Sequence, residues 1–322
     1  IGRRTGLKIP RWQHHEGSIP SPSTMQKLLV ILGPNASGKS MLAVKIAKKF
    51  NGEIISADSR QVYKGLDIGT GKITKKEMCG IPHHLLDVAN PKNRFSVADY
   101  QKLAREKISE IFSRGHTPII CGGTGFYIHS LIDGVVLPDV APDPKLRKKL
   151  EQESTETLFA MLQKLDPTRA SSIDSKNKVR LIRAIEIVKS LGKVPQNSKP
   201  NTECLVFDTL QIGINISPEK LKENINKRLL SRIEMGMIEE VENLHKKGLS
   251  WKRMEELGLE YRYLAYYLQN RVTKSEMITK LQIEIWHYAK RQMTWFKRDK
   301  RIKWFNINEK DDIILLCKKA IS

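Results

Sequence analysis

Short apolar runs and amphipathic stretches alternate along the first part of the chain. Three apolar runs have the length of strands: residues 27–32, 53–58 and 117–121. The segments 40–50 and 96–114 show helical spacing, and Ser96 is a candidate N-cap for the second, which should end before Gly115. Strands that alternate with helices predict an α/β fold, with a parallel sheet covered by helices on both faces.

The pattern changes at about residue 138. Residues 143–192 contain several helical stretches rich in Lys and Arg and no clear strand, and residues 193–204 are polar and contain proline, as linkers do. An apolar run at 205–216 predicts a return to the sheet. We therefore expect an α/β core interrupted by a helical insertion domain. The core comprises residues 25–137 and 205–322, and the insertion comprises residues 138–204.

The rest of the chain is predicted to be helical. One long helix should have Ser217 as its N-cap, Pro218 at its first position and Gly248 beyond its end. Two further helices are expected near residues 253–268 and 274–298.

Residues 1–24 show little apolar periodicity and lack the apolar stretch of a secretory signal. We expect them to form a disordered tail, with Met25 as a candidate for the native start. No apolar run approaches the roughly 18 residues of a membrane span, so no membrane partner is expected. The four cysteines show no metal-ligand spacing, which is typical of reduced thiols in a cytoplasmic protein. They are Cys79, Cys121, Cys204 and Cys317.

Charge narrows the class of partner. Lys and Arg total 56 against 35 acidic residues, which gives a formal net charge of +21. Such an excess indicates a polyanionic partner, with nucleic acid as the first candidate. Basic proteins also bind small phosphates or use their charge for solubility, so charge alone does not decide.

A phosphate-binding loop lies between the first strand and the first helix. Its residues, GPNASGKS, match GxxxxGK[ST] in the strand-to-helix context that this motif requires. They are Gly33, Pro34, Asn35, Ala36, Ser37, Gly38, Lys39 and Ser40. Backbone N–H groups would hold a diphosphate or triphosphate, Lys39 would neutralise it, and Ser40 would help to bind Mg²⁺. The core is therefore predicted to be P-loop NTPase-like.

The acid that could work with this loop is Asp58. A nucleotide-hydrolysing P-loop enzyme normally has an acid at the end of a buried strand to hold Mg²⁺, and the strand at 117–121 has none. Asp58 ends the second strand, and the polar Ser59, Arg60 and Gln61 that follow are suited to reading a substrate. A small-molecule kinase is compatible with this arrangement, and so is a structural role in which Asp58 caps the next turn.

Seven segments, spread in order over residues 27–305, resemble signatures of the tRNA dimethylallyltransferase family, also called tRNA isopentenyltransferases or IPP transferases. They are GPNASGKS (33–40), DSRQVYKGLDIGTGK (58–72), PHHLLD (82–87), GGTGFY (122–127), NKVRLIRAIEI (177–187), GLEYRYL (258–264) and AKRQMTWFKR (289–298). The resemblance implies transfer of a dimethylallyl group from dimethylallyl diphosphate to N6 of the adenosine 3′ to the anticodon, with Mg²⁺ as cofactor. The chain lacks the C-terminal Cys₂His₂ pattern that eukaryotic members often carry, so it resembles the bacterial type.

The resemblance also implies catalytic roles. It assigns the loop 33–40 and Arg228 to the diphosphate of the prenyl donor, and Asp58 to the adenine N6 amine as general base or hydrogen-bond acceptor. Thr124 would lie near the adenosine. Lys39, Mg²⁺ and arginines would stabilise the charge on the departing diphosphate. The residues alone leave two other roles open, a solvated helix face around Arg228 and a tight turn around Thr124.

For tRNA, the resemblance implies contacts from two parts of the chain. The residues are Asp58, Ser59, Arg60, Gln61, Thr124, Arg147, Val179, Arg180, Leu181, Ile182 and Arg183. Arg180 and Arg183 are three residues apart and so share a helix face, where an ordinary solvated basic surface is the alternative. Trp295 and Phe296 are predicted core. Lys290, Arg291 and Gln292 are further candidates for the active site or for tRNA.

Three positions depart from the family pattern. Asn35 replaces a more frequent Thr, Cys121 replaces a small aliphatic residue, and Glu260 replaces a frequent Gly. None removes a group that the chemistry needs, but Glu260 puts the role of its loop in doubt.

Three other functions remain open at this stage. An adenylate isopentenyltransferase of the cytokinin type would share the loop and Asp58, and acceptance of AMP would identify it. A P-loop kinase would consume ATP and leave the basic insertion unexplained. A non-catalytic RNA-binding protein would not need Lys39, Ser40 and Asp58. A large RNA partner makes a monomer the simplest expectation.

Overall fold

The computed structural model describes residues 27–195 and 207–321. The predicted tail with Met25 lies outside these residues, as do Cys204 and most of the predicted linker. Within the described ranges, no helix is both long and apolar enough to cross a bilayer.

Six strands form one parallel sheet in the order β3-β2-β4-β1-β5-β6. Their bounds are β1 Lys27–Leu32, β2 Gly52–Ala57, β3 His83–His84, β4 Thr117–Gly122, β5 Asp208–Asn215 and β6 Lys303–Asn306. β1 lies between β4 and β5, so the chain leaves it toward one side of the sheet for β2 and returns to its other side for β5. In such sheets ligands bind beyond the carboxyl ends of the strands, where the order reverses.

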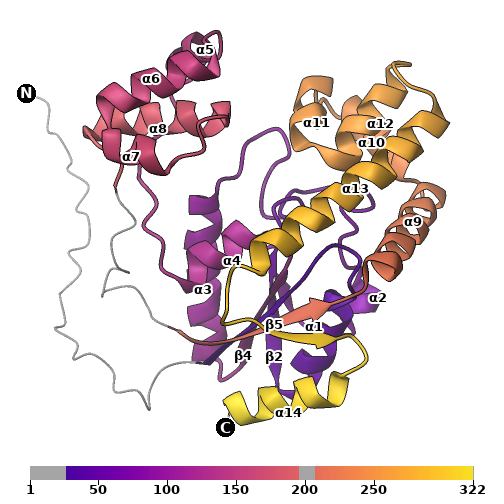
Figure 1. Cartoon of the computed structure of the whole chain (residues 1–322). Coiled ribbons are helices and arrows are strands. Elements are labelled where there is room, and N and C mark those ends of the chain that lie inside the picture. Colours follow the sequence, from indigo (N-terminus) through magenta and orange to yellow (C-terminus); the bar gives the residue numbers. More distant parts are fainter. Residues whose placement is uncertain (1–26, 196–206, 322) are drawn as a thin grey trace, which may run out of the picture.

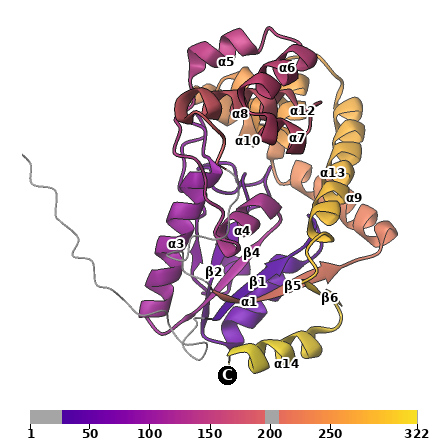
Figure 2. The same ribbon diagram turned by 60° about the vertical axis from the view of Figure 1, so that its left-hand side comes forward.

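Helices cover both faces of the sheet (Figures 1 and 2). Alternate residues of β1 face opposite sides, and Leu29 and Ile31 pack under α1 (Lys39–Lys49) and α14 (Lys310–Ile321). Leu28 and Val30 belong to the larger core on the other face, formed with α3 (Val97–Ser113), α4 (Gly125–Ile132) and helices from the C-terminal half. This arrangement confirms the predicted P-loop-like α/β class.

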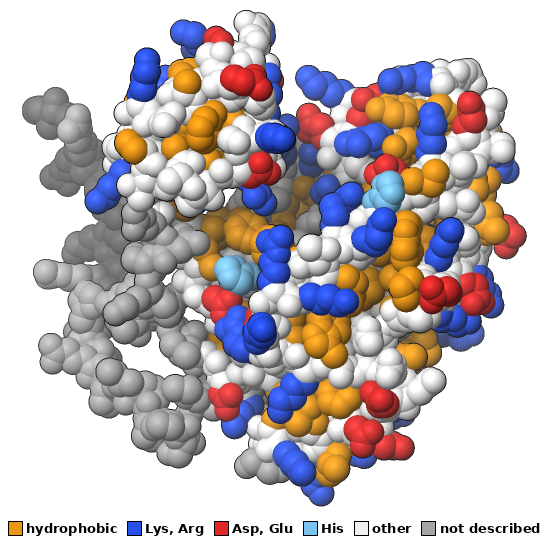
Figure 3. Space-filling model, viewed as in Figure 1, with side chains coloured by type: hydrophobic (Ala, Val, Ile, Leu, Met, Phe, Trp, Pro, Cys, Tyr) orange, Lys and Arg blue, Asp and Glu red, His pale blue; other side chains and the backbone are white. Residues whose placement is uncertain are grey.

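Two groups of helices stand beyond the carboxyl edge of the sheet (Figure 1). The helical arm comprises α9 Pro218–Glu234, α10 Met237–Lys246, α11 Trp251–Leu257, α12 Leu259–Leu268 and α13 Lys274–Phe296; the short α2 (Lys75–Met78) precedes α3. The insertion comprises α5 Pro144–Leu150, α6 Thr155–Leu165, α7 Pro167–Ser172 and α8 Lys178–Leu191, and it has an apolar core of its own. In Figure 3 a hollow edged with Lys and Arg separates the insertion from the arm.

The predicted N-caps Ser96 and Ser217 are confirmed, but several element bounds are wrong. The single long helix expected after Ser217 ends at Glu234, because Gly236 adopts a left-handed conformation with φ of 97° and starts α10 in a new direction. Gly258, at φ of 75°, likewise divides the helix expected at 253–268. Four elements were not predicted from the sequence, because they are short or lie at the edges of the fold: α2, β3, β6 and α14.

Candidate active site

The loop after β1 forms an anion cradle. Ala36 and Gly38 adopt positive φ angles of 63° and 86°, which turn the backbone into the first turn of α1. Gly38 caps that helix without a side-chain hydrogen bond, so the free N–H groups of its first turn point toward a ligand. Lys39 Nζ donates to Pro34 O at 3.1 Å, which folds the loop around the ammonium group. This is the geometry that a phosphate-binding loop requires.

Two arginines of α9 close the other side of this cradle. Arg228 Nη2 donates to Gly71 O at 3.1 Å, and Arg232 Nη1 donates to Gly69 O at 3.4 Å. Arg232 is 8% exposed and Arg228 is half-buried, so the alternative of a solvated helix face is wrong for this turn of α9. Burial lowers the pKa of Lys39 and of Arg232, and burial followed by the neighbouring Arg232 lowers the pKa of Arg228 to about 10.

The loop that meets these arginines is held by a carboxylate that the sequence analysis did not identify. Glu240, on α10, accepts hydrogen bonds from three consecutive backbone N–H groups and from the Tyr261 hydroxyl, at 2.6–3.0 Å. The three N–H donors belong to Asp67, Ile68 and Gly69. The Gly-rich DIGTG segment was the only sequence signal for this contact. Glu240 thereby fixes the carbonyl groups of Gly69 and Gly71 opposite the two arginines.

Asp58 and Thr124 come together where β2 and β4 end. The two strands pair in parallel, with Ala57 beside Gly122, so the residues that follow them meet at one edge. Asp58 Oδ1 accepts from the N–H groups of Arg60 and Gln61 at 2.8 and 3.3 Å. This oxygen therefore caps the turn, which is the structural role predicted for Asp58 as an alternative. Thr124 Oγ1 accepts from Ser59 N at 3.0 Å.

Asp58 opens into a polar cavity of about 260 Å³ between the sheet edge and the helical arm. Its lining includes the predicted Ser59 and Arg60, together with Thr70, Glu260, Tyr288 and Arg291. Burial, followed by the charge of Asp58, raises the pKa of the Tyr288 hydroxyl to about 12, so this hydroxyl stays protonated at neutral pH. Asn35 of the anion cradle also lines the cavity, and the two sites are therefore adjacent.

Gln292 joins the cradle to the edge of β4. Its Oε1 accepts from Asn35 N at 2.9 Å, and its Nε2 donates to Gly123 O at 2.9 Å and to Asn35 Oδ1 at 3.3 Å. A Cβ on Gly123 would stand 2.3 Å from Gln292 Nε2, which explains the glycine. Gln292 is 5% exposed. The other two candidates of this segment, Lys290 and Arg291, are exposed, and Arg291 also lines the polar cavity.

The insertion residues divide into two groups. Arg147 forms two hydrogen bonds with the buried Glu186, at 2.7 and 2.6 Å, and Arg183 donates to Glu186 and to Val140 O at 3.4 and 2.9 Å. These two arginines are therefore engaged in holding the start of the insertion to α8. Arg180 is exposed, and its side chain forms no ion pair with any described residue.

Two of the α8 residues predicted to contact tRNA are buried. Leu181 and Ile182 are 0% and 6% exposed and fill the core of the insertion, because the helical period turns them inward. The expectation that their side chains contact tRNA is therefore wrong. Val179, in contrast, is 78% exposed on the same helix.

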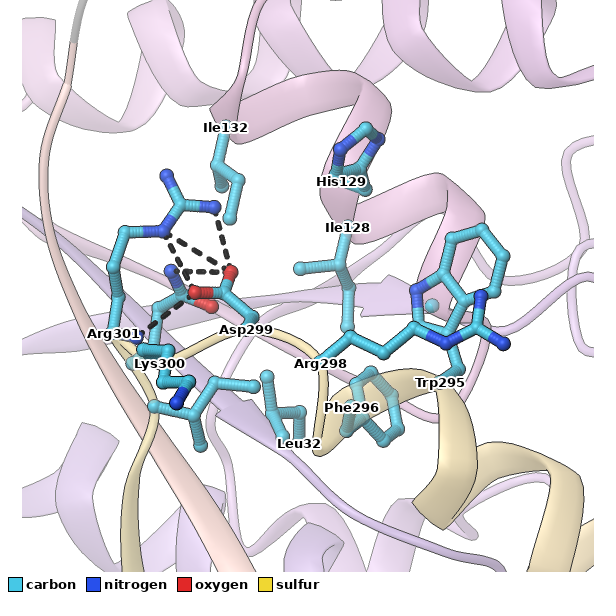
Figure 4. Close-up of a pocket in the computed structure, with 13 residues that line it drawn as sticks. Leu32, Ile128, His129, Ile132, Trp295, Phe296, Arg298, Asp299, Lys300 and Arg301 are labelled. Carbon is cyan, nitrogen blue, oxygen red and sulfur yellow. Dashed lines mark hydrogen bonds and ion pairs between the residues drawn. The ribbon is translucent and has the colours of Figure 1, made fainter. Parts of the chain in front are cut away.

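A second cavity, of about 480 Å³, lies between α4 and the turn after α13 (Figure 4). Arg301 crosses it to bind Asp299 and Asp133, each at 2.6 Å. Phe296 is 3% exposed, which confirms its predicted core position, while Trp295 is half-buried and packs over Gly125. None of the predicted catalytic residues lines this cavity.

The side chains around the cradle provide few ligands for a metal ion unless a phosphate is also bound. Within residues 27–195 and 207–321, no group of three or more His, Cys, Asp or Glu side chains could hold one. Ser40 is exposed beside the cradle, so a metal ion there would rely mainly on the oxygens of a bound phosphate and on water.

Comparison with known proteins agrees with this geometry. A family model described as IPP transferase matches residues 61–299. A tRNA dimethylallyltransferase of Carboxydothermus hydrogenoformans is 42% identical over 309 residues, covering 92% of this chain and 97% of the relative. That of Bacillus subtilis is 39% identical over 306 residues, covering 93% and 97%.

Solved structures give the same result. The full-length tRNA isopentenylpyrophosphate transferase of Bacillus halodurans is 36% identical, with a TM-score of 0.70, over 92% of this chain and 97% of that one. A eukaryotic dimethylallyltransferase described as acting on tRNA is 26% identical, with a TM-score of 0.79, over 92% and 79%.

Proposed function

The chain belongs to the IPP transferase family, and we propose that it transfers the dimethylallyl group of dimethylallyl diphosphate to N6 of the adenosine 3′ to the anticodon in tRNA, releasing diphosphate. The proposal rests on two different sites that lie side by side. An anion cradle and a polar cavity share Asn35 at the carboxyl edge of the sheet. A diphosphate in the first and a base in the second would place donor and acceptor side by side.

The cradle serves the leaving group. Breaking the bond between C1 of the prenyl group and the diphosphate oxygen concentrates negative charge on that oxygen. The free backbone N–H groups at the start of α1, Lys39 and Arg228 would surround this position, and groups fixed before the reaction stabilise such charge most effectively. Enzymes of this family generally use a divalent metal ion. We assign Mg²⁺, held by Ser40 and the diphosphate oxygens, which would supply further charge neutralisation.

Asp58 serves the acceptor. As the new bond forms between N6 and C1, the amine loses a proton, and of the carboxyl groups that line the cavity we assign Asp58, at the sheet edge beside the anion cradle, to receive it. Oδ1 is engaged in the turn, and Oδ2 accepts no hydrogen bond from any described residue, which leaves it available to N6. Thr124 accepts from the backbone of Ser59 and also hydrogen-bonds the Tyr288 side chain, so it holds together the part of the cavity where the adenine would lie.

The hollow between the insertion and the arm suits the anticodon stem-loop (Figure 3). The adenosine must leave its stack to reach the cavity, which is less costly from a single-stranded loop than from a duplex. Arg60 and Gln61 would contact the displaced nucleotide, and Arg180 and Val179 the RNA bound against the insertion. Residues 138–204 would act as a tRNA-binding domain whose shape Arg147 and Arg183 maintain. One chain supplies every group, which favours a monomer. We assign it to the cytoplasm because its relatives are tRNA-modifying enzymes.

The test uses purified protein, Mg²⁺ and radiolabelled dimethylallyl diphosphate, with AMP and an unmodified anticodon stem-loop as parallel acceptors. We expect label in the RNA, reduced about 100-fold or more by Asp58→Asn, since the amide still accepts from Arg60 N but cannot take a proton. Asp208→Asn, at the opposite end of the sheet in an exposed pair with Lys27, should react normally. Label in AMP alone would indicate an adenylate isopentenyltransferase, and label in neither would contradict the proposal.

A further inference from the structure

Two guanidinium groups converge on one point beside the anion cradle. Arg228 and Arg232 are four residues apart and so lie on one face of α9. A Cβ on Gly71 would stand 2.3 Å from Arg228 Nη2 and 1.6 Å from Arg232 Nη2. Both nitrogens therefore occupy the space that the glycine leaves open, and the two cations repel each other at close range.

No nearby carboxylate pairs closely with this cluster. Lys39, Arg228 and Arg232 bring three positive charges, and the acids that act on them are Asp58, Glu260, Glu77 and Glu240. Among the described residues, the one ion pair of the two arginines is Arg232–Glu260, and it is long, at 3.4 Å. Two guanidinium groups held together in a largely buried place are costly without a close anion, and a bound anion would relieve that cost.

Arg232 has donors to spare. Its Nη1 contacts Gly69 O and Glu260 Oε1, each at 3.4 Å, whereas strong hydrogen bonds between charged groups are about 2.7–2.9 Å long. No hydrogen bond from the described residues engages its Nη2, the nitrogen that meets Arg228 at Gly71. Glu260 is buried beside it in the cavity.

We propose that Arg232 is a second arginine of the diphosphate site and that Glu260 is the counter-ion it uses when that site is empty. When diphosphate binds, Arg232 donates through Nη2 to a phosphate oxygen and its contact with Glu260 weakens. Glu260 thereby competes with the diphosphate for Arg232 and limits its affinity. This inference rests on the proposed prenyl transfer, because it concerns how the leaving group is held.

The test measures binding of inorganic pyrophosphate with Mg²⁺ by calorimetry, using the full chain. Glu260→Gln keeps an acceptor for Arg232 but removes the competing charge, so it should bind pyrophosphate more tightly than the unchanged protein. Adding Arg232→Met in that background leaves no buried carboxylate unpaired, so the variant should fold. It should bind roughly 10- to 100-fold more weakly than Glu260→Gln alone, as expected for loss of a hydrogen bond to a charged group.

The matched control is the pair Arg271–Glu255, which lies on the same helical arm at 2.8 Å. Glu255→Gln, with and without Arg271→Met, should leave pyrophosphate binding unchanged. Equal binding by Glu260→Gln and its double variant, with weaker binding of the anticodon stem-loop, would show that Arg232 only supports the loop at 258–263. Unchanged affinity in Glu260→Gln alone would overturn its role as competitor. If the unchanged protein neither binds pyrophosphate nor transfers the prenyl group, the proposed function itself fails.

Discussion

Gln292 connects the anion cradle to the edge of β4, and its replacement should weaken that connection most clearly. Gln292→Met keeps the length of the side chain but removes its hydrogen bonds to Asn35 N and Gly123 O, each at 2.9 Å. The residue is 5% exposed, so water cannot easily replace both. A buried polar group left without its partner costs about 1–3 kcal/mol. Two such groups predict a loss of roughly 2–6 kcal/mol in the free energy of unfolding.

Urea unfolding followed by circular dichroism measures this loss directly. Because Asn35 belongs to the diphosphate cradle and Gly123 precedes Thr124, the same change should also lower kcat for prenyl transfer by about tenfold or more, as misplacement of reacting groups does. Gln269→Met is the control: among the described residues its side-chain amide donates only to Ala265 O, one turn back in the helix that Gln269 caps, so stability should change by less than about 0.5 kcal/mol. A Gln292→Met protein with normal stability and normal kcat would refute the bridging role.

Two further predictions concern charge. The Glu53 carboxylate is 3% exposed, and although burial alone would raise its pKa, hydrogen bonds from Arg114, His84 and His116 outweigh this and lower it to about 2. The folded state is therefore stabilised at pH above 4.5 by about 3 kcal/mol, and this stabilisation is lost as pH falls toward 2. The stability of Glu53→Gln should not fall in this way between pH 4.5 and 2. A pH profile of stability equal to that of the unchanged protein would contradict the role given to Glu53. Arg180→Ala should weaken binding of the anticodon stem-loop and reduce the slope of log K against log salt by about 0.7–0.9. Lys45→Ala, which removes an exposed lysine of α1, should leave both unchanged, and equal slopes for the two variants would return Arg180 to an ordinary solvated surface.

The elements that the sequence predicts best are those whose signal is local. The first strand, the phosphate-binding loop and its helix follow from a short apolar run, a glycine pattern and an amphipathic stretch. The N-caps Ser96 and Ser217 are equally local and are present. By contrast, the break at Gly236 depends on its positive φ. A glycine within a helical pattern permits this conformation but does not show that the helix ends there.

The candidate site shows the same division. Residues in contiguous motifs, such as Asp58 and Lys39, are visible in the sequence because the motif carries them. Glu240, Arg232 and Gln292 each act on a segment 160–260 positions away, so only the folded chain identifies them. Assigning the whole α8 segment to tRNA failed at Leu181 and Ile182, where helical periodicity points the side chains into the core.

Nucleoside analysis of an anticodon stem-loop, after reaction with the purified protein, Mg²⁺ and dimethylallyl diphosphate, directly tests the proposed prenyl transfer. We expect N6-dimethylallyladenosine at the adenosine 3′ to the anticodon, and no product when that adenosine is replaced by guanosine. Modification elsewhere in the RNA, or a phosphorylated product formed from ATP in place of a prenylated one, would contradict it.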